Sequence, residues 1–216
     1  MTARNQLRVL DLFCCQGGAG MGYHQAGFNV TGIDIAPQPR YPFAFHQADA
    51  LAYLARHGTD FDLIHASMPC QRYTRCQQIQ SREHPDLIAP VRALLQQTGR
   101  PYVIENVPGA PLLDPVELCG AMFGLRTYRH RLFETSFPLA RRHHPRHLAP
   151  NAKMGRPVRE GEFMHIVGNF SNVPLARDIM DMPWATRDGL REAIPPVYTR
   201  HIAEQFLAAP LAEVAA

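Results

Sequence analysis

The stretch LRVLDLFCCQGGAG, residues 7–20, decides the fold that we expect for this chain. Residues 7–13 are mostly apolar, as in a buried strand, and residues 16–20 form a glycine-rich turn. A helix is predicted to follow over residues 21–26. A strand that runs through such a turn into a helix is typical of nucleotide-type cofactor sites. Glycines let the backbone approach the ligand, and the helix N-terminus offers free N–H groups.

Strand-like and helix-like stretches continue to alternate after this turn. Strands are predicted over residues 29–33, 43–47, 61–66 and 102–105, and helices over residues 50–57 and 85–98. This alternation indicates an α/β fold with a mostly parallel sheet and helices on both faces. Residues 195–208 are predicted to form a closing helix, because two prolines stand at its start.

Several notable side chains stand where the predicted strands end. In parallel sheets, ligands bind at the carboxyl ends of the strands. The residues at these ends are Asp11, Phe13, Asp34, Cys70, Glu105 and Asn106. Asp34 is suited to accept hydrogen bonds from ribose hydroxyls, and Asp49 from an adenine amino group. This edge of the sheet is therefore the predicted active site.

Cys70 and Glu105 are the candidate reactive groups at this edge. A thiol at a strand end in an electropositive cleft can be activated to a nucleophilic thiolate. A structural cysteine is the alternative for Cys70. Glu105 is expected to lie beside Cys70 and to exchange hydrogen bonds with a ring nitrogen, and an ordinary carboxylate at a strand end is the alternative.

A pair of arginines, Arg129 and Arg131, begins a further predicted strand. Alternate residues of a strand share one face, so both guanidinium groups are expected to point into the cleft. There they would hold a phosphate, a base carbonyl oxygen or the carboxylate of Glu105. A solvated pair is the alternative.

Positive charge is concentrated in residues 126–159, which carry nine Lys or Arg and one acid, Glu134. This segment has a net charge of +8, and because the whole chain carries +3 the remainder carries −5. A basic segment on a mildly acidic body suggests a polyanionic partner, and a solvated loop surface is the alternative. Residues 137–172 are predicted to form a small basic lobe between a core, residues 1–136, and a returning segment, residues 173–216.

The five cysteines indicate neither a disulfide framework nor a thiolate metal site. They are Cys14, Cys15, Cys70, Cys76 and Cys119, an odd number without a C-x-x-C motif. The histidines of residues 143–147 offer zinc ligands, but no cysteine is near in sequence and Pro145 interrupts any helical face. We therefore expect no metal. No apolar run suggests a membrane span or a secretory signal, so a cytoplasmic protein, by default a monomer, is expected.

The order and spacing of these motifs resemble the DNA cytosine carbon-5 methyltransferase family, in particular its compact phage and prophage members. The matching motifs are Asp11-Leu12-Phe13 with Gly17-Gly18, Pro69-Cys70-Gln71, Glu105-Asn106-Val107, Leu118-Cys119-Gly120 with Phe123-Gly124, and Arg129-x-Arg131. The sequence departs from the family at Cys15, where glycine is usual, and at Thr127, where glutamine is usual. The Gly-Asn-Ala-Val segment before the closing helix is missing.

The resemblance implies a Rossmann-like methyltransferase fold, S-adenosylmethionine as cofactor and duplex DNA as partner. Cys70 would add to carbon 6 of a flipped-out cytosine, Glu105 would contact ring nitrogen 3, Arg131 would hold the base carbonyl and Arg129 would support Glu105. The cofactor residues implied are Asp11, Phe13, Gly17, Gly18, Asp34, Ile35, Asp49, Ala50 and Pro69. The DNA-binding residues expected are Gln71, Arg141, Arg142 and Arg146.

Three alternatives stay open on the sequence. The chain could be a catalytically silent binder of S-adenosylmethionine or DNA, a cytosine methyltransferase that acts on RNA, or an enzyme that transfers another one-carbon group. Retention of both Cys70 and Glu105 argues against the first.

Overall fold

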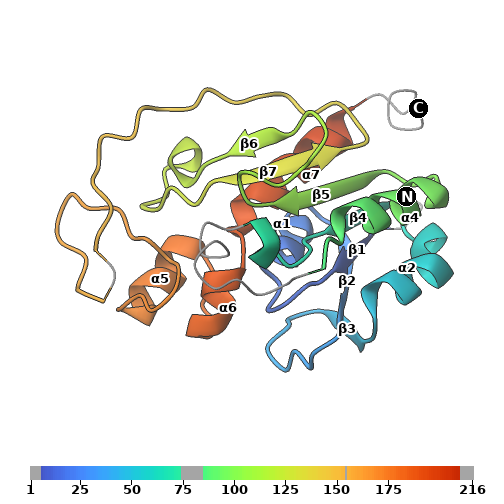
Figure 1. Ribbon diagram of the computed structural model, residues 1–216, viewed down its shortest axis with the longest axis horizontal. Helices are drawn as coiled ribbons and strands as arrows, with labels where there is room; N and C mark the ends of the chain where they lie inside the picture. Colours follow the sequence, from blue (N-terminus) through green and yellow to red (C-terminus); the bar gives the residue numbers. More distant parts are fainter. Residues whose placement is uncertain (1–5, 74–84, 154, 210–216) are drawn as a thin grey trace, which may run out of the picture.

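A seven-stranded sheet forms the centre of the computed structural model, with the strand order β3-β2-β1-β4-β5-β7-β6 (Figure 1). The structure describes residues 6–73, 85–153 and 155–209, so Cys76 lies outside the described residues. The strands are β1 (Arg8–Leu12), β2 (Asn29–Asp34), β3 (Ala44–Gln47), β4 (Leu63–Ala66), β5 (Tyr102–Asn106), β6 (Val116–Leu118) and β7 (Arg131–Thr135). β1 to β5 are parallel, whereas β7 runs antiparallel to both β5 and β6. The carboxyl ends of β1, β2, β4 and β5 therefore lie along one edge.

Helices cover both faces of this sheet. The helices are α1 (Gly18–Gln25), α2 (Ala50–His57), α4 (Ile88–Thr98), α5 (Val173–Met180), α6 (Arg187–Glu192) and α7 (Pro196–Ala208), with short 3-10 turns at Gly58–Asp60, Gln71–Tyr73 and Gly120–Phe123. α1 packs against α7 on one face, and α2 packs against α4 on the other.

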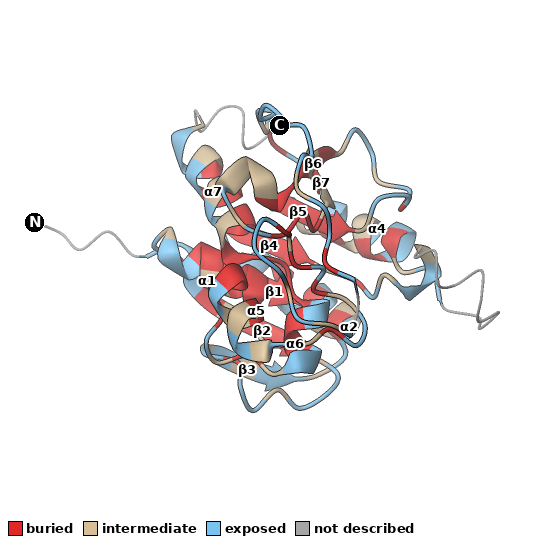
Figure 2. Ribbon diagram, turned by 90° about the vertical axis from the view of Figure 1, so that its left-hand side faces the viewer, coloured by how far each residue is buried: buried red, intermediate tan, exposed pale blue. Residues whose placement is uncertain are grey.

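Strand alternation assigns apolar side chains to the two faces. Val9 belongs to the hydrophobic cluster with α1 and α7, whereas its neighbour Leu10 belongs to the cluster with α2 and α4. Leu63 and Ile64 of β4 divide in the same way. The central strands are buried on both faces and are therefore mostly apolar, as expected for a parallel sheet. Figure 2 shows the buried residues gathered in these strands and the inner faces of the helices.

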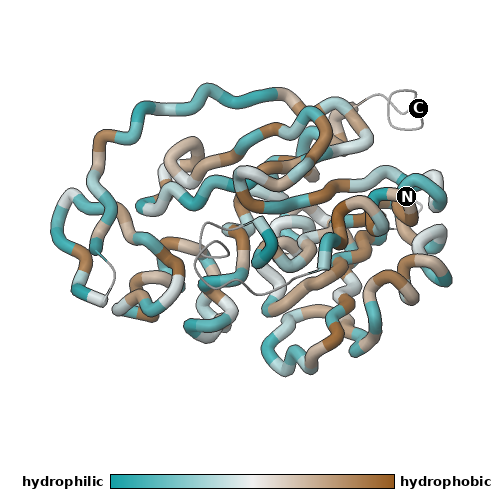
Figure 3. Tube along the Cα trace, viewed as in Figure 1, coloured by the Kyte–Doolittle hydropathy of each residue, from teal (hydrophilic) through white to brown (hydrophobic). Residues whose placement is uncertain are grey.

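The chain leaves the sheet after β7, and the predicted lobe, residues 137–172, called the basic segment from here on, follows a long path to α5 (Figure 1). Among its described residues, 137–153 and 155–172, the only regular pairing is an isolated bridge between Asn151 and Phe163. Most of this path is hydrophilic (Figure 3). Its last part is anchored by a third hydrophobic cluster, in which Met164 and Phe170 pack with Met180 of α5 and Leu190 of α6. That cluster spans the predicted lobe boundary at residue 172.

The structure differs from the predicted elements chiefly at their ends. α2 has the predicted bounds, whereas α1 begins at Gly18, three residues before the predicted start, because Gly17 adopts a left-handed conformation (φ 82°) that serves as its N-cap. Among the described helices, none has the length and apolarity that a membrane crossing requires.

Candidate active site

A cavity of about 270 Å³ opens at the carboxyl edge of the sheet. It contains predicted site residues from every strand end named above: Asp11, Phe13, Gly18, Asp34, Ile35, Pro69, Cys70, Gln71, Glu105 and Arg131. These residues come from five separate stretches of the chain. The parallel strands bring four of these stretches together, and the fifth, at Arg131, comes from the antiparallel strand β7.

The glycine-rich turn is held in shape by Asp34. The backbone N–H of Cys15 donates to Asp34 Oδ2 at 3.0 Å, and the N–H of Ala36 donates to Oδ1 at 3.0 Å. Phe13 and Cys15 have φ of 58° and 45°, in the left-handed region that favours glycine. This conformation is consistent with the glycine that usually stands at the position of Cys15 in the family that the sequence resembles. The turn keeps the required conformation here, at a cost of about 1–2 kcal/mol for the non-glycine residue.

Asp11 is fully buried in the wall of the cavity. Its Oδ2 accepts a hydrogen bond from Tyr41 at 2.9 Å, whereas Oδ1 has no hydrogen-bond partner among the described residues. Burial raises the pKa of Asp11 to about 7, although the Tyr41 hydroxyl and the Gly20 backbone oppose the shift. A buried carboxylate oxygen without a partner is costly, so a cationic or hydrogen-bonding ligand would be favoured beside it.

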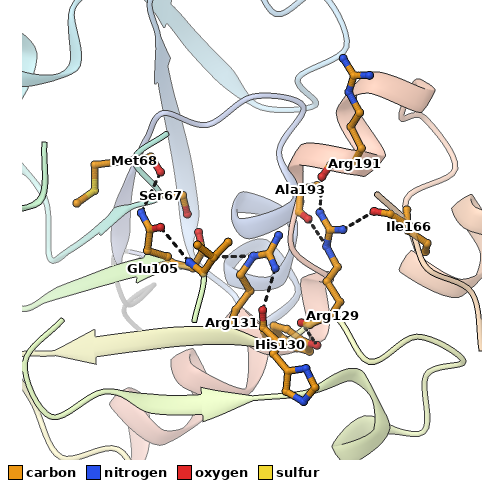
Figure 4. A network of polar contacts seen from close by, with 12 residues as sticks. Ser67, Met68, Glu105, Arg129, His130, Arg131, Ile166, Arg191 and Ala193 are labelled. Atoms are coloured by element: carbon orange, nitrogen blue, oxygen red, sulfur yellow. Dashed lines mark hydrogen bonds and ion pairs between the residues drawn. The ribbon is translucent and has the colours of Figure 1, made fainter. Parts of the chain in front are cut away.

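Cys70, Glu105 and Arg131 line the same cavity and form its candidate reactive corner. Arg131 Nε lies 3.0 Å from Glu105 Oε1, an ion pair whose carboxylate is buried (Figure 4). Burial raises the pKa of the Cys70 thiol, and the positive charge of Arg131 is the largest influence that opposes this rise. Burial also raises the pKa of Glu105, again opposed mainly by Arg131. One guanidinium group therefore favours the anionic form of both neighbours.

Contrary to the prediction from strand alternation, Arg129 does not line this cavity beside Arg131, although its positive charge lowers the pKa of both Cys70 and Glu105. β7 begins only at Arg131, and Arg129 precedes it with φ 34°, so the alternation of strand side chains does not reach Arg129. Its buried guanidinium instead donates to three backbone carbonyls: those of Ala193 at 2.7 Å, Ile166 at 2.6 Å and Arg191 at 2.8 Å (Figure 4). Arg129 therefore fastens the end of the basic segment and the residues before α7 to the sheet, and Arg131 is the arginine paired with Glu105.

Other predicted cofactor residues lie outside the lining of this cavity. Gly17 is the N-cap of α1. Asp49 is the N-cap of α2, where its Oδ1 accepts the N–H of Ala52 at 2.8 Å, and Ala50 is the buried first residue of that helix. A capping role for Asp49 leaves its second carboxylate oxygen for another partner.

The predicted DNA-binding arginines are exposed along the basic segment. Arg141 pairs with Asp114 at 2.8 Å, and both side chains are more than half exposed. The guanidinium carbon of Arg142 lies 4.8 Å from the centre of the Phe123 ring. Arg146 is exposed. A polyanion therefore has access to all three side chains.

Sequence reasoning missed the residues that close the cavity from the C-terminal side. They are Arg191 and Glu192 at the end of α6, and Ala193 and Ile194 in the link to α7. Cys15 Sγ lies 3.3 Å from Glu192 Oε2, and a side chain at Gly18 would collide with the carbonyl of Ile194. The proline pair marked the return of the chain, but it carried no information about which residues it returns to. Ser67, Met68, Cys14 and Ala19 also line the cavity and were not predicted.

Solved structures with the same fold exist, although no protein-family model and no curated protein matches the chain. A protein of E. coli, described as a DNA modification methyltransferase encoded within a prophage, aligns with a TM-score of 0.62 and 14% identity, over 94% of this chain and 99% of that chain. The Entamoeba histolytica methyltransferase EhMeth aligns with a TM-score of 0.59 and 12% identity, over 95% of this chain and 99% of that one. The predicted Rossmann-like methyltransferase fold is thereby confirmed.

Proposed function

We propose that this chain is a DNA cytosine carbon-5 methyltransferase that uses S-adenosylmethionine and attacks its target base through Cys70. The observation that carries the proposal is the convergence of Cys70, Glu105 and Arg131 in one cavity with the glycine-rich turn and Asp34. The methyltransferase fold supports the same cofactor and reaction class. The motif order supports the choice of cytosine.

The residues of the cavity fit S-adenosylmethionine. The unpartnered Oδ1 of Asp11 suits the ammonium of the methionine part. Gly18 lines the same cavity, and Gly17 precedes it as the N-cap of α1. Asp34 would accept from the ribose hydroxyls. The adenine would contact Phe13, Pro69 and the side chain of Ile35, which is 70% exposed at the cavity. Asp49 and Ala50 would approach the adenine amine from the start of α2.

The proposed mechanism begins with the Cys70 thiolate, which adds through Sγ to carbon 6 of cytosine and makes carbon 5 nucleophilic. Glu105 contacts ring nitrogen 3 and the exocyclic amine and favours the charge that develops there. Arg131 holds Glu105 in place and favours the thiolate. The cofactor supplies an electrophilic methyl group. After carbon 5 gains the methyl group, a base removes the proton that remains on carbon 5. The Sγ–carbon 6 bond then breaks, and the double bond between carbons 5 and 6 re-forms.

The target cytosine must leave the duplex to reach a cavity of this kind, because carbons 5 and 6 are shielded in stacked DNA. Gln71 lies at the mouth beside Cys70 and is proposed to contact the nucleic acid. The basic segment would grip phosphates on the same molecule.

Substrate competition tests this assignment. The purified protein is incubated with S-adenosylmethionine labelled in its methyl group and with equal amounts of duplex DNA and transfer RNA. We expect label in DNA, as 5-methylcytosine by mass spectrometry of the digested product. Label in RNA would identify the protein as an RNA cytosine methyltransferase. A cytosine with a different group on carbon 5 would mean that another one-carbon group is transferred. Cofactor binding without transfer to either substrate would support the silent binder.

Cofactor affinity is expected to rise with pH between about 5.5 and 7, by up to about tenfold per unit, because the pKa of Asp11 is about 7. Below that pH the carboxyl is neutral, whereas above it the anion attracts the ammonium. The window ends where an α-amino group itself begins to lose its proton, near pH 7.7–8.0. Isothermal titration calorimetry of S-adenosylmethionine across this range measures the effect.

The control for this pH dependence is Asp11→Asn, which is expected to bind the cofactor weakly and with little change over the same range. Without cofactor, the free energy of unfolding should change with pH in the opposite direction and fall as the pH rises. The folded pKa of Asp11 lies above its unfolded value, so its contribution is complete below about pH 4 and is lost as the pH rises through about 7. If the cofactor affinity of the unaltered protein did not change with pH, Asp11 would not contact the cofactor.

Replacement of Arg141, Arg142 and Arg146 by glutamine is expected to weaken binding to all DNA sequences alike. Loss of three phosphate contacts would reduce the slope of log affinity against log salt by up to about 2.7. Because the segment offers mainly positive charge, we also expect a recognition site of only about two to four base pairs. Fluorescence anisotropy at several salt concentrations measures both the DNA affinity and its dependence on salt. Selective loss for one sequence would mean that these arginines read bases.

A further inference from the structure

Four metal-ligand side chains from distant parts of the sequence meet beside β6 and β7. They are Cys119, His130, His144 and His147, and their ligand atoms all lie within 4.8 Å of one another. Cys119 follows β6, His130 precedes β7, and the other two come from the basic segment. Of the described residues, only these form such a group.

The separations between the atoms match those of a tetrahedral site. Cys119 Sγ lies 3.4 Å from His147 Nε2, and His130 Nε2 lies 3.1 Å from His144 Nε2. Zinc bonds of 2.0–2.3 Å in tetrahedral geometry place neighbouring ligand atoms about 3.3–3.7 Å apart. Small adjustments of the side chains would therefore admit an ion at the centre.

The surroundings of the group also suit a metal. His144 Nδ1 lies 3.0 Å from the carbonyl oxygen of Pro145, which can only accept a hydrogen bond, so Nε2 keeps its lone pair in the neutral ring. The Tyr128 ring stacks on His147 with 3.6 Å between centroids and fixes the orientation of the imidazole. Glu117 Oε1, 3.7 Å from His144 Nε2, adds negative charge.

We propose that Cys119, His130, His144 and His147 bind one zinc ion that fastens the basic segment to the sheet. One thiolate and three imidazoles are ligands that zinc prefers, and four protein ligands leave no open position, as in structural rather than catalytic sites. This proposal departs from the expectation of no metal, which rested on the lack of a cysteine near the histidines in sequence and on the interruption by Pro145. Cys119, the ligand that seemed to be missing, comes from the end of β6.

The site would also connect the metal to the reactive corner. His130 stands between Arg129 and Arg131, and its carbonyl accepts from the Arg131 guanidinium at 2.8 Å. A zinc ion on the His130 ring would thus fix the start of β7 as well as the path of residues 144–147. Metal binding at this site is independent of the reaction that the protein performs.

Metal analysis of the purified full chain, produced without a polyhistidine tag, tests the proposal. We expect about one zinc ion per chain. Replacement of zinc by cobalt should give the strong visible absorption of a tetrahedral site and a sulfur-to-cobalt charge-transfer band. Cys119→Ser should remove the charge-transfer band. His144→Ala, a change at an exposed position, should reduce the zinc content to near zero while the protein stays folded.

The matched control is His143→Ala, which removes an exposed neighbouring histidine outside the group. It should keep the zinc. A chelator should lower the melting temperature of the unaltered protein and of His143→Ala, but not that of His144→Ala. A folded chain that neither contains zinc nor binds cobalt would overturn the proposal, as would equal loss of zinc in the His143 and His144 variants. Either result would mean that the four side chains form a hydrogen-bonded cluster without a metal.

Discussion

Replacement of Cys70 by alanine is expected to lower the rate of methyl transfer by about 10³-fold or more, because no other group would form the bond to carbon 6. DNA that contains 5-fluorocytosine provides a sharper measurement. Fluorine cannot leave carbon 5 as a proton does, so the bond from Cys70 Sγ to carbon 6 should persist. Denaturing electrophoresis and intact mass should then detect a covalent complex in the unaltered protein and none in Cys70→Ala.

The control for trapping is Cys15→Ala, which removes the other half-buried thiol of the cavity. Burial raises the pKa of Cys15 to about 12, and the nearby Glu192 carboxylate adds to the shift, so this thiol is a poor nucleophile. Cys15→Ala should still be trapped once cofactor is saturating. A covalent complex that persists in Cys70→Ala would mean that another thiol is the nucleophile.

Glu105→Gln is expected to lower the maximal rate by about 10²–10³-fold while cofactor affinity stays nearly unchanged. The substitution keeps the size of the side chain but removes the acid that we propose to contact ring nitrogen 3, an interaction that would strengthen in the transition state. Single-turnover kinetics at saturating cofactor measures the rate, and calorimetry measures the affinity. A rate within a few-fold of the unaltered protein would exclude Glu105 from the chemistry.

Glu134→Gln is the matched control for this change. Glu134 is also a buried carboxylate in the sheet, and Arg92 pairs with it through two bonds of 2.7 Å. Breaking either buried pair leaves an arginine partly uncompensated, so both variants should lose stability to a similar extent. Only Glu105→Gln should also lose the chemical step. Equal loss of rate in both would reduce the role of Glu105 to holding the fold.

The parts of the site that were predictable lie at the ends of strands. Periodicity identifies a strand, and a parallel sheet then gathers the strand ends at one edge, so Asp11, Asp34, Cys70 and Glu105 could be placed together without coordinates. The same reasoning failed at Arg129, because it assumed that strand alternation began two residues earlier than it does. The boundaries of an element are less determined by local sequence than its presence.

Contacts between distant segments were beyond the sequence. Residues 191–194 close the cavity because α7 packs on α1, where Thr199 Oγ1 donates to the carbonyl of Ala19 at 2.8 Å. The meeting of Cys119 with the histidines likewise depends on the path of the basic segment over β6 and β7. Neither contact has a periodic pattern or a short spacing that would reveal it. Both depend on tertiary packing.

Bisulfite sequencing of DNA from a host that lacks its own cytosine methylation, and that expresses this chain, tests the central claim most directly. The account predicts protected cytosines at one short repeated site of about two to four base pairs. It also predicts complete conversion of the same sites when Cys70→Ala is expressed at an equal level. Complete conversion in DNA from cells that contain the folded, cofactor-binding protein would contradict the proposed function.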